Sequence, residues 1–262
     1  MYVFPLQVMF ETFSASSVYI ALSHVLSLLH AGLKTGVVIN LGAGMCDTVP
    51  IYENHALQHA IFRPGVSGRD LDDYLVKLMS YRGYDMGTRA ERMIVKDIKE
   101  KLCYVAPSDF DKEETVAENV KEDFYELPEG QLFMLGAERF RCPELLFKPS
   151  ELYPEQAGRG IHHNIRSTIQ RCDKDIHEEL YANIVISGGS SVFPGLGERL
   201  RKEIADLAPK GTTVNVIAPP DRKQSAFFGG VMLALDPDFN SMSISQKEYN
   251  EFGPTIVHRK CF

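Results

Sequence analysis

Apolar residues recur along the chain at two spacings, which predict a mixture of helices and strands. Repeats of three and four residues predict amphipathic helices over residues 18–29, 71–79, 94–102, 161–169, 196–207 and 225–235. Short apolar runs predict strands over residues 36–40, 48–52, 184–186 and 214–217, of which 184–186 has the pattern of a buried strand. Thr88 and Glu91 have the spacing of a capping box before the third helical repeat. Helices that alternate with buried strands indicate an α/β chain.

Glycine-rich turns connect several of these elements and mark candidate sites. The strands over 36–40 and 48–52 are joined through glycines and predict a hairpin, and a second hairpin is predicted over 125–140. In a strand–loop–helix–strand unit over 184–217, a glycine turn at 188–195 leads into the helix. Glycines in such a turn let backbone N–H groups approach an anion, although the same turns often serve only the geometry of the chain.

The composition narrows the class of protein. The 262 residues are enough for one large domain or two small ones, and a hydrophobic content of 44% predicts a folded core. A formal charge of −7 without a basic stripe argues against nucleic acid as a partner. No apolar run reaches the roughly 18–20 residues that span a bilayer, and residues 1–6 do not resemble a secretory signal. The five scattered cysteines predict reduced thiols of the cytoplasm, with Cys261 exposed.

Seven segments resemble segments of actins, and they follow one another in the order of that family. They cover residues 48–53, 68–71, 97–106, 139–144, 184–195, 217–223 and 256–262. The similarity extends from about Met9 to the last residue. On this resemblance the chain is identified as a member of the actin family, whose members bind adenine nucleotide in a deep cleft between two lobes.

The resemblance implies an α/β fold of the actin-like ATPase (ribonuclease-H-like) type, with the second lobe complete and the first lobe only partial. Residues 1–33 and 223–262 would be remnants of the first lobe. Residues 34–66 and 156–222 would form the inner subdomain of the second lobe, and residues 67–155 its outer subdomain. A full actin begins with a further phosphate loop and a small subdomain, which nothing in this sequence resembles. We therefore expect apolar helix faces that need a partner or repacking, unless the sequence is incomplete at its start.

The resemblance also implies which residues would hold ATP or ADP. The residues expected to line the adenine pocket are Gly189, Ser190, Val192, Phe193 and Lys223, and Gly188 of the same turn is also expected to bind nucleotide. Lys99 and Glu100 would border the adenine and the ribose. The second phosphate loop would consist of Gly42, Ala43, Gly44 and Met45, and Gly68 would lie near the floor of the cleft.

The positions that handle magnesium and the attacking water depart from the family pattern. Asn40 stands where actins usually have an aspartate that helps to hold hydrated magnesium, and a neutral amide is a poor ligand for a hard dication. Leu41 and Ala43 replace a serine and a second aspartate in the loop. Ser23 and Asp47 occupy the positions of the glutamine and the histidine that position the attacking water.

These departures imply weak magnesium binding and ATP hydrolysis that is lost or very slow, because phosphoryl transfer depends on metal, positioning and charge stabilisation. Ser23 is too short to reach the water, and the carboxylate of Asp47 would repel a polyphosphate. The alternative is that Asn40 and Ala43 are neutral changes in a site that still binds nucleotide through backbone amides.

The function implied by the resemblance is that of an actin-like cytoskeletal protein of the cytoplasm. Its partners would be actin, actin-binding proteins or further copies of itself. The alternative is a non-polymerising actin-related binding module in a multiprotein complex, for which a nuclear location is also open. An enzyme of the sugar-kinase branch fits poorly, because the aligned loop around Ala43 lacks a catalytic aspartate.

Overall fold

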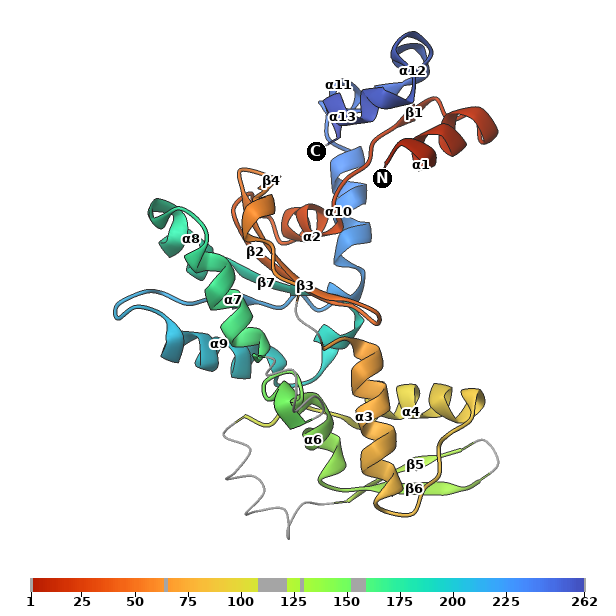
Figure 1. The fold of residues 1–262 in the computed structure, drawn as a ribbon, viewed down its shortest axis with the longest axis vertical. Coiled ribbons are helices and arrows are strands. Elements are labelled where there is room, and N and C mark those ends of the chain that lie inside the picture. The colour runs from red at the N-terminus through yellow and green to blue at the C-terminus, as the bar shows by residue number, and fades with distance from the viewer. Residues whose placement is uncertain (1, 64–65, 108–121, 128–129, 152–158, 262) are drawn as a thin grey trace.

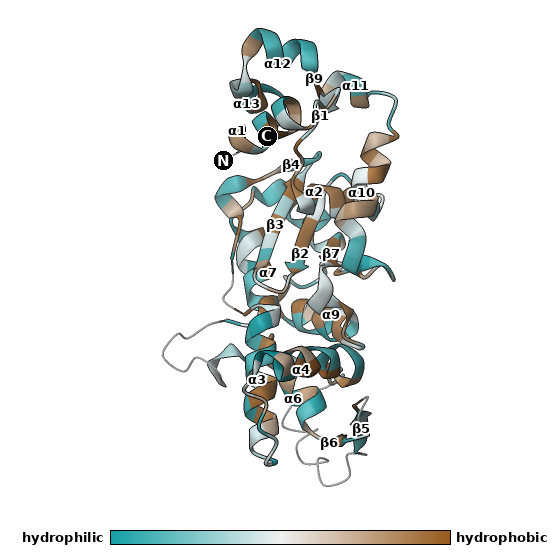
Figure 2. Cartoon of the chain, turned by 90° about the vertical axis from the view of Figure 1, so that its right-hand side faces the viewer, coloured by the Kyte–Doolittle hydropathy of each residue, from teal (hydrophilic) through white to brown (hydrophobic). Residues whose placement is uncertain are grey.

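The computed structural model describes residues 2–63, 66–107, 122–127, 130–151 and 159–261, which form three parts along one long axis (Figures 1 and 2). The central part is a five-stranded sheet between two layers of helices. The outer part consists of helices and a two-stranded hairpin. The terminal part gathers segments from both ends of the chain.

The central sheet has the strand order β4–β3–β2–β7–β8. Its strands are β4 (His55–Ala56), β3 (Cys46–Tyr52), β2 (Gly36–Leu41), β7 (Ile184–Ser187) and β8 (Val216–Ile217). Strand β2 pairs antiparallel with β3 and parallel with β7, so the predicted hairpin and the predicted parallel unit share one strand. Because parallel strands end at the same edge of a sheet, the turn after β2 and the turn after β7 lie next to each other.

Helices cover both faces of this sheet (Figure 1). On one face lie α2 (Ser23–His30) and α10 (Ser225–Ala234), and on the other lie α7 (Ile161–Gln170), α8 (His177–Ala182) and α9 (Leu196–Leu207). The sequence therefore forms the three-layer α/β arrangement that the alternation of helices and strands predicts.

Alternate side chains of the buried strands fill the two cores. Val38 and Val185 pack with Leu28 of α2 on one face. Ile39 and Ile186 belong to the larger core on the other face. Strands β2 and β7 are thus buried on both sides, as is usual where parallel strands are covered by helices, and this explains their continuous apolar runs.

The outer part contains α3 (Gly68–Ser80), α4 (Arg89–Leu102), α6 (Glu138–Glu144) and the antiparallel hairpin of β5 (Asp123–Glu126) and β6 (Leu132–Leu135). The predicted capping box begins α4: the Thr88 backbone N–H donates to the Glu91 carboxylate, and the Glu91 N–H donates to Thr88 Oγ1. The hairpin predicted over 125–140 is confirmed, but α6 replaces the end of its second strand. Residues 128–129 of the predicted turn lie outside the described residues.

The terminal part is built from both ends of the chain. The first end supplies α1 (Val3–Gln7), a π-helical turn (Val8–Thr12) and β1 (Ser17–Val18). The last end supplies α11 (Phe239–Met242), β9 (Ile244–Ser245), α12 (Gln246–Phe252) and α13 (Val257–Lys260). Strand β1 pairs antiparallel with β9. Cys261 is buried beside these elements, so the prediction that it is exposed is wrong, whereas all five cysteines are free thiols.

The helix predicted over 18–29 begins later than its pattern indicates. Ser17 and Val18 belong to β1 and pair with Ser245 and Ile244, and α2 begins only at Ser23. A strand partner from the far end of the chain therefore overrides the local apolar repeat. The predicted end of the helix is confirmed by Gly32, whose φ of 75° lies in the left-handed region that glycine favours.

Short 3₁₀ turns join several of these elements. They are Gln58–Ala60, Pro149–Glu151, Lys174–Ile176, Gly189–Val192, Arg222–Gln224 and Pro254–Ile256. Among the residues that the structure describes, no helix is both long and apolar enough to cross a bilayer.

Helix α10 crosses α2 at a very short distance, and a glycine makes this crossing possible. A Cβ atom on Gly229 would fall inside van der Waals contact with the carbonyl oxygen of Leu26. The neighbouring Gly230 is different, because a Cβ atom there would lie 3.7 Å from Leu26 Cδ1, which is an ordinary contact. The helix pair therefore depends on only one of two adjacent glycines.

Replacing Gly229 by alanine should lower the free energy of unfolding by about 1–3 kcal/mol or more, because the helices must move apart. The matched variant Gly230→Ala should be neutral or should stabilise the protein by up to about 1 kcal/mol, because alanine favours a helix over glycine. Urea unfolding followed by circular dichroism measures both values. Equal stabilities of the two variants would contradict the close crossing.

Candidate functional site

The turn after β2 is bound to the beginning of α3 by its main chain. The N–H of Gly68 donates to the carbonyl oxygen of Gly42 at 2.9 Å, and the N–H of Arg69 donates to that of Ala43 at 2.8 Å. The turn itself is closed by the N–H of Gly42, which donates to the carbonyl oxygen of Met45 at 2.9 Å. These bonds hold the predicted phosphate loop against the outer part of the molecule.

Gly68 is the point at which three segments meet. A Cβ atom on this residue would lie 2.6 Å from Ser190 Oγ, 3.0 Å from Ala43 Cα and 3.2 Å from the Gly42 carbonyl oxygen. The absence of a side chain at residue 68 therefore favours the close approach of the turn after β2, the turn after β7 and the start of α3.

A cleft of about 320 Å³ opens beside this junction, within the size range of clefts that hold small molecules. Eight of the predicted site residues line it: Ala43, Lys99, Glu100, Gly189, Ser190, Val192, Phe193 and Lys223. Gly42 and Gly68 support it through the bond described above, and Gly188 directly precedes its wall. Gly44 and Met45 lie outside its lining, and Met45 is exposed.

One wall of the cleft combines apolar side chains with open backbone. Phe193 is buried, whereas Val192 is 42% exposed and presents an apolar surface. A Cβ atom on Gly189 would meet no atom within 4 Å, so space lies directly over the backbone there. Such a wall suits a flat, uncharged group, while the polar residues gather on the opposite side.

The opposite side of the cleft is held by a buried lysine that is already paired. Lys99 lies 2.6 Å from Asp72 and donates to the carbonyl oxygen of Gly68 at 2.8 Å. Burial raises the pKa of Asp72, and the contact with Lys99 offsets part of that rise. Asp72 and Lys96 also line the cleft, although neither was predicted to do so. The only signal in the sequence was the spacing of four residues between Lys96 and Glu100, which places both on one side of α4.

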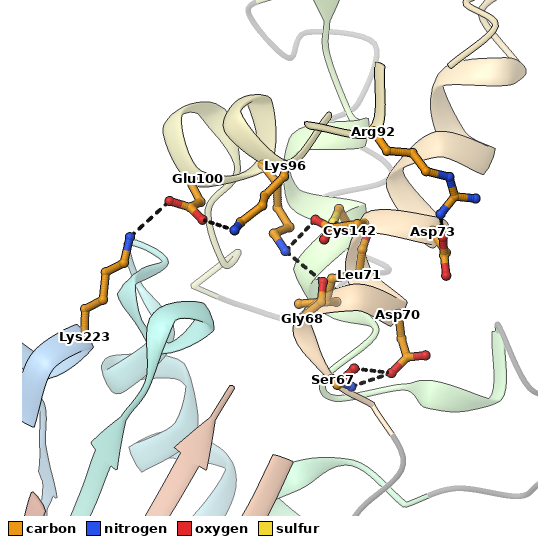
Figure 3. A network of polar contacts seen from close by, with 12 residues as sticks. Ser67, Gly68, Asp70, Leu71, Asp73, Arg92, Lys96, Glu100, Cys142 and Lys223 are labelled. Atoms are coloured by element: carbon orange, nitrogen blue, oxygen red, sulfur yellow. Dashed lines mark hydrogen bonds and ion pairs between the residues drawn. The ribbon is translucent and has the colours of Figure 1, made fainter. Parts of the chain in front are cut away.

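Charged side chains meet at the mouth of the cleft. The Glu100 carboxylate lies 3.3 Å from Lys223 Nζ and 4.0 Å from Lys96 Nζ (Figure 3). All three groups are at least 40% exposed, so each pair contributes little to stability. A charged ligand can therefore replace one partner of these pairs with little loss of free energy.

Comparison with known protein families shows that residues 5–262 match a family described as Actin. The chain belongs to the actin family. The match covers almost the whole chain and thus includes every part of the cleft. The mixed α/β architecture agrees with membership, and actins in general bind ATP or ADP with magnesium.

In this actin-family chain, the region predicted to handle magnesium and water contains a residue that the sequence analysis missed. His24 Nε2 lies 3.0 Å from Asp47 Oδ1, and both side chains are about nine-tenths buried. Asn40 Nδ2 lies 3.5 Å from the same oxygen, because Asn40 and Asp47 are paired across the β2–β3 hairpin. Ser23 is exposed and makes no such contact. A histidine directly after Ser23 was the only signal for this arrangement.

The charge of Asp47 is thereby offset within the protein. Burial acts to raise the pKa of Asp47, but the contacts with His24 and Asn40 together outweigh it, and the pKa is lowered. The predicted repulsion of a polyphosphate by this carboxylate is correspondingly reduced. The same pairing occupies the carboxylate and leaves Asn40 as a neutral neighbour, so this donor set does not fit a hard dication. Among the described residues, no group of three or more His, Cys, Asp and Glu side chains is arranged for a metal ion.

Replacing His24 by leucine should raise the pKa of Asp47, because burial then raises this pKa without the opposing contact of His24. In the native protein the pKa lies below its ordinary 3.8. The stability that this group contributes is therefore present above about pH 4 and is lost as the pH falls through the lowered pKa. In His24→Leu the charged, buried carboxylate of Asp47 should lower the free energy of unfolding by about 1–3 kcal/mol at neutral pH. Protonation of this carboxylate should restore that free energy as the pH falls.

The pH dependence of urea unfolding, together with NMR titration of the Asp47 carboxyl, measures this effect. The control is His30→Leu, which removes the partner of Asp221, a carboxylate that is far more exposed. The control should leave the titration of Asp47 unchanged. An unchanged pKa of Asp47 in His24→Leu would show that the contact has no electrostatic role.

Proposed function

We propose that this chain is an actin-like cytoskeletal protein that binds ATP or ADP in the cleft described above and hydrolyses ATP very slowly or not at all. The observation that carries the proposal is the convergence of eight predicted residues, from four separate segments, on one cleft. Segments so far apart in the sequence meet there only through the shared strand β2 and the junction at Gly68.

Binding of the nucleoside is supported by the two unlike sides of the cleft. The base would lie against Val192 and Phe193 over the open backbone at Gly189. The ribose would lie toward Glu100 and Lys99, and Lys223 would approach the base from the mouth. ATP or ADP supplies the charged phosphates, which backbone N–H groups of the glycine turns would bind without help from side chains.

Loss of efficient hydrolysis is supported by the chemistry around Asn40. Positioning of metal and water in phosphoryl transfer needs carboxylates or polar groups that are free to bind them. Here the carboxylate of Asp47 is engaged by His24, Asn40 is neutral, and Ser23 is exposed and short. We therefore infer that magnesium binds chiefly to the phosphates of the nucleotide, with little contribution from the protein.

Membership of the actin family supports actin, actin-binding proteins or further copies of the chain as partners, and a place in the cytoplasm and cytoskeleton. A non-polymerising binding module in a multiprotein complex remains the second candidate. It is favoured by one observation, the exposed apolar side chains Phe227, Val231 and Met232 on α10 and Leu235 directly after it. Such a surface is suited to a permanent protein partner.

Equilibrium dialysis with radiolabelled ATP should show saturable binding that changes less than about threefold when magnesium is removed with EDTA, a difference below about 0.7 kcal/mol. Gly189→Val should weaken binding by at least about tenfold, because its side chain occupies the space over the backbone while the fold is retained. Gly230→Ala, outside the cleft, should bind as the native protein does. Absence of saturation at millimolar ATP, or binding that requires magnesium, would refute the proposal.

Filament formation separates the two candidate functions. If the chain is a cytoskeletal component, high-speed centrifugation should bring it into the pellet, alone or together with added actin, and its amount should depend on protein concentration. If it is a non-polymerising module, it should stay in the supernatant at every salt and nucleotide condition, while ATP binding remains. Size-exclusion chromatography before each run excludes aggregates as the cause of pelleting.

A further inference from the structure

Asp72 places a carboxylate in a cleft that is proposed to bind a polyanion, and the proposed function gives this carboxylate no task. The residue lies on α3 and lines the cleft, and its side chain is only 19% exposed. A carboxylate beside a nucleotide repels the phosphates, and burial strengthens that repulsion because little water screens it. The position of Asp72 therefore bears on which ligands the cleft prefers.

Asp72 forms an ion pair with a buried lysine of the cleft. Among the described residues, three lysines line the cleft: Lys96 and Lys223 are more than half exposed, whereas the side chain of Lys99 is 5% exposed. Since water and salt screen exposed charges, Lys99 is the lysine that would attract a bound anion most strongly. Asp72 Oδ1 lies 2.6 Å from Lys99 Nζ, which is the distance of a charge-assisted hydrogen bond. The carboxylate thereby offsets the charge of Lys99.

The main chain holds Lys99 beside this carboxylate. Its ammonium group also donates to the carbonyl oxygen of Gly68 at 2.8 Å, at the junction of the inner sheet with the outer helices. If Lys99 turned toward a phosphate, it would have to leave these partners and would strand Asp72 as an unpaired, largely buried charge, which costs free energy. We therefore expect the pair to remain in place when a ligand binds.

We propose that Asp72 is a specificity-determining residue that lowers the preference of the cleft for highly charged nucleotides, because it neutralises Lys99. The inference rests on the function proposed above and adds that the apolar wall and the glycine turns supply most of the affinity. An uncharged nucleoside is little affected by the pair, whereas each phosphate adds negative charge that Lys99 no longer attracts. Removal of the carboxylate should therefore strengthen binding more, the more charge the ligand carries.

Isothermal titration calorimetry of the full chain with adenosine, ADP and ATP tests this inference. The main variant is Asp72→Asn, whose side chain has nearly the same size but no charge, and Asp72→Ser is the second variant if the first is unstable. The Kd of ATP should fall by at least about fivefold, that of ADP by less, and that of adenosine by less than about twofold. The gain for ATP should shrink at high salt. A merely structural role of Asp72 would change all three Kd values alike.

Asp73 offers a matched control at the next position of α3. Its side chain is half exposed, pairs with Arg92 and lies outside the lining of the cleft (Figure 3). Asp73→Asn removes the same charge from the protein and should leave all three Kd values unchanged within about twofold. In a Lys99→Met background, Asp72→Asn should no longer strengthen ATP binding, because the carboxylate acts through Lys99. Circular dichroism should show that each variant is folded.

Inorganic tripolyphosphate separates this inference from the proposed function, because it carries the charge of a nucleotide but no base. If the native chain binds neither adenosine nor ATP, the proposed function fails. Asp72→Asn should even then bind tripolyphosphate at least about fivefold more tightly than the native chain and Asp73→Asn do. The inference is overturned if Asp72→Asn and Asp73→Asn bind ATP and tripolyphosphate equally well. It is also overturned if Asp72→Asn weakens binding of adenosine and ATP alike, because the carboxylate then binds the base.

Discussion

The backbone contact at Gly68 is the constraint on which the rest of the structure depends. Its N–H binds the turn after β2, and its carbonyl oxygen accepts a hydrogen bond from Lys99 of α4. A Cβ atom at this position would lie 2.6 Å from Ser190 Oγ and 3.0 Å from Ala43 Cα, so the glycine favours the close approach of the inner sheet to the outer helices. The cleft is lined by residues of both surfaces beside this junction.

This arrangement separates binding from catalysis. The elements proposed to bind nucleotide are main-chain turns and an apolar wall, and these depend on packing of the sheet rather than on particular ionisable groups. In the proposed function, hydrolysis would depend instead on side chains around Asn40, where the contact with His24 engages the carboxylate of Asp47. Under the proposed function, nucleotide binding and turnover would rest on different parts of the site, so the first could be retained while the second is lost.

Much of the fold follows from the sequence, and the exceptions have physical causes. Four strands of the central sheet, the capping box of α4 and the cleft residues Gly189, Ser190, Val192 and Phe193 were predicted because each depends on local pattern or family motif. Strand β1 was not predicted, because its partner β9 lies more than two hundred residues away along the chain. The pairing of His24 with Asp47 and the place of Asp72 also arise only when α2, β3 and α3 are assembled. Contacts between distant segments leave no trace in local periodicity.

Phosphorus NMR of ATP incubated with equimolar protein and magnesium tests the central claim most directly, since it observes binding and hydrolysis in one sample. The account predicts that the ATP resonances shift or broaden on addition of protein. It also predicts that inorganic phosphate accumulates no faster than in a sample without protein. Unchanged ATP resonances would contradict the nucleotide cleft, and phosphate release well above the control would contradict the loss of efficient hydrolysis.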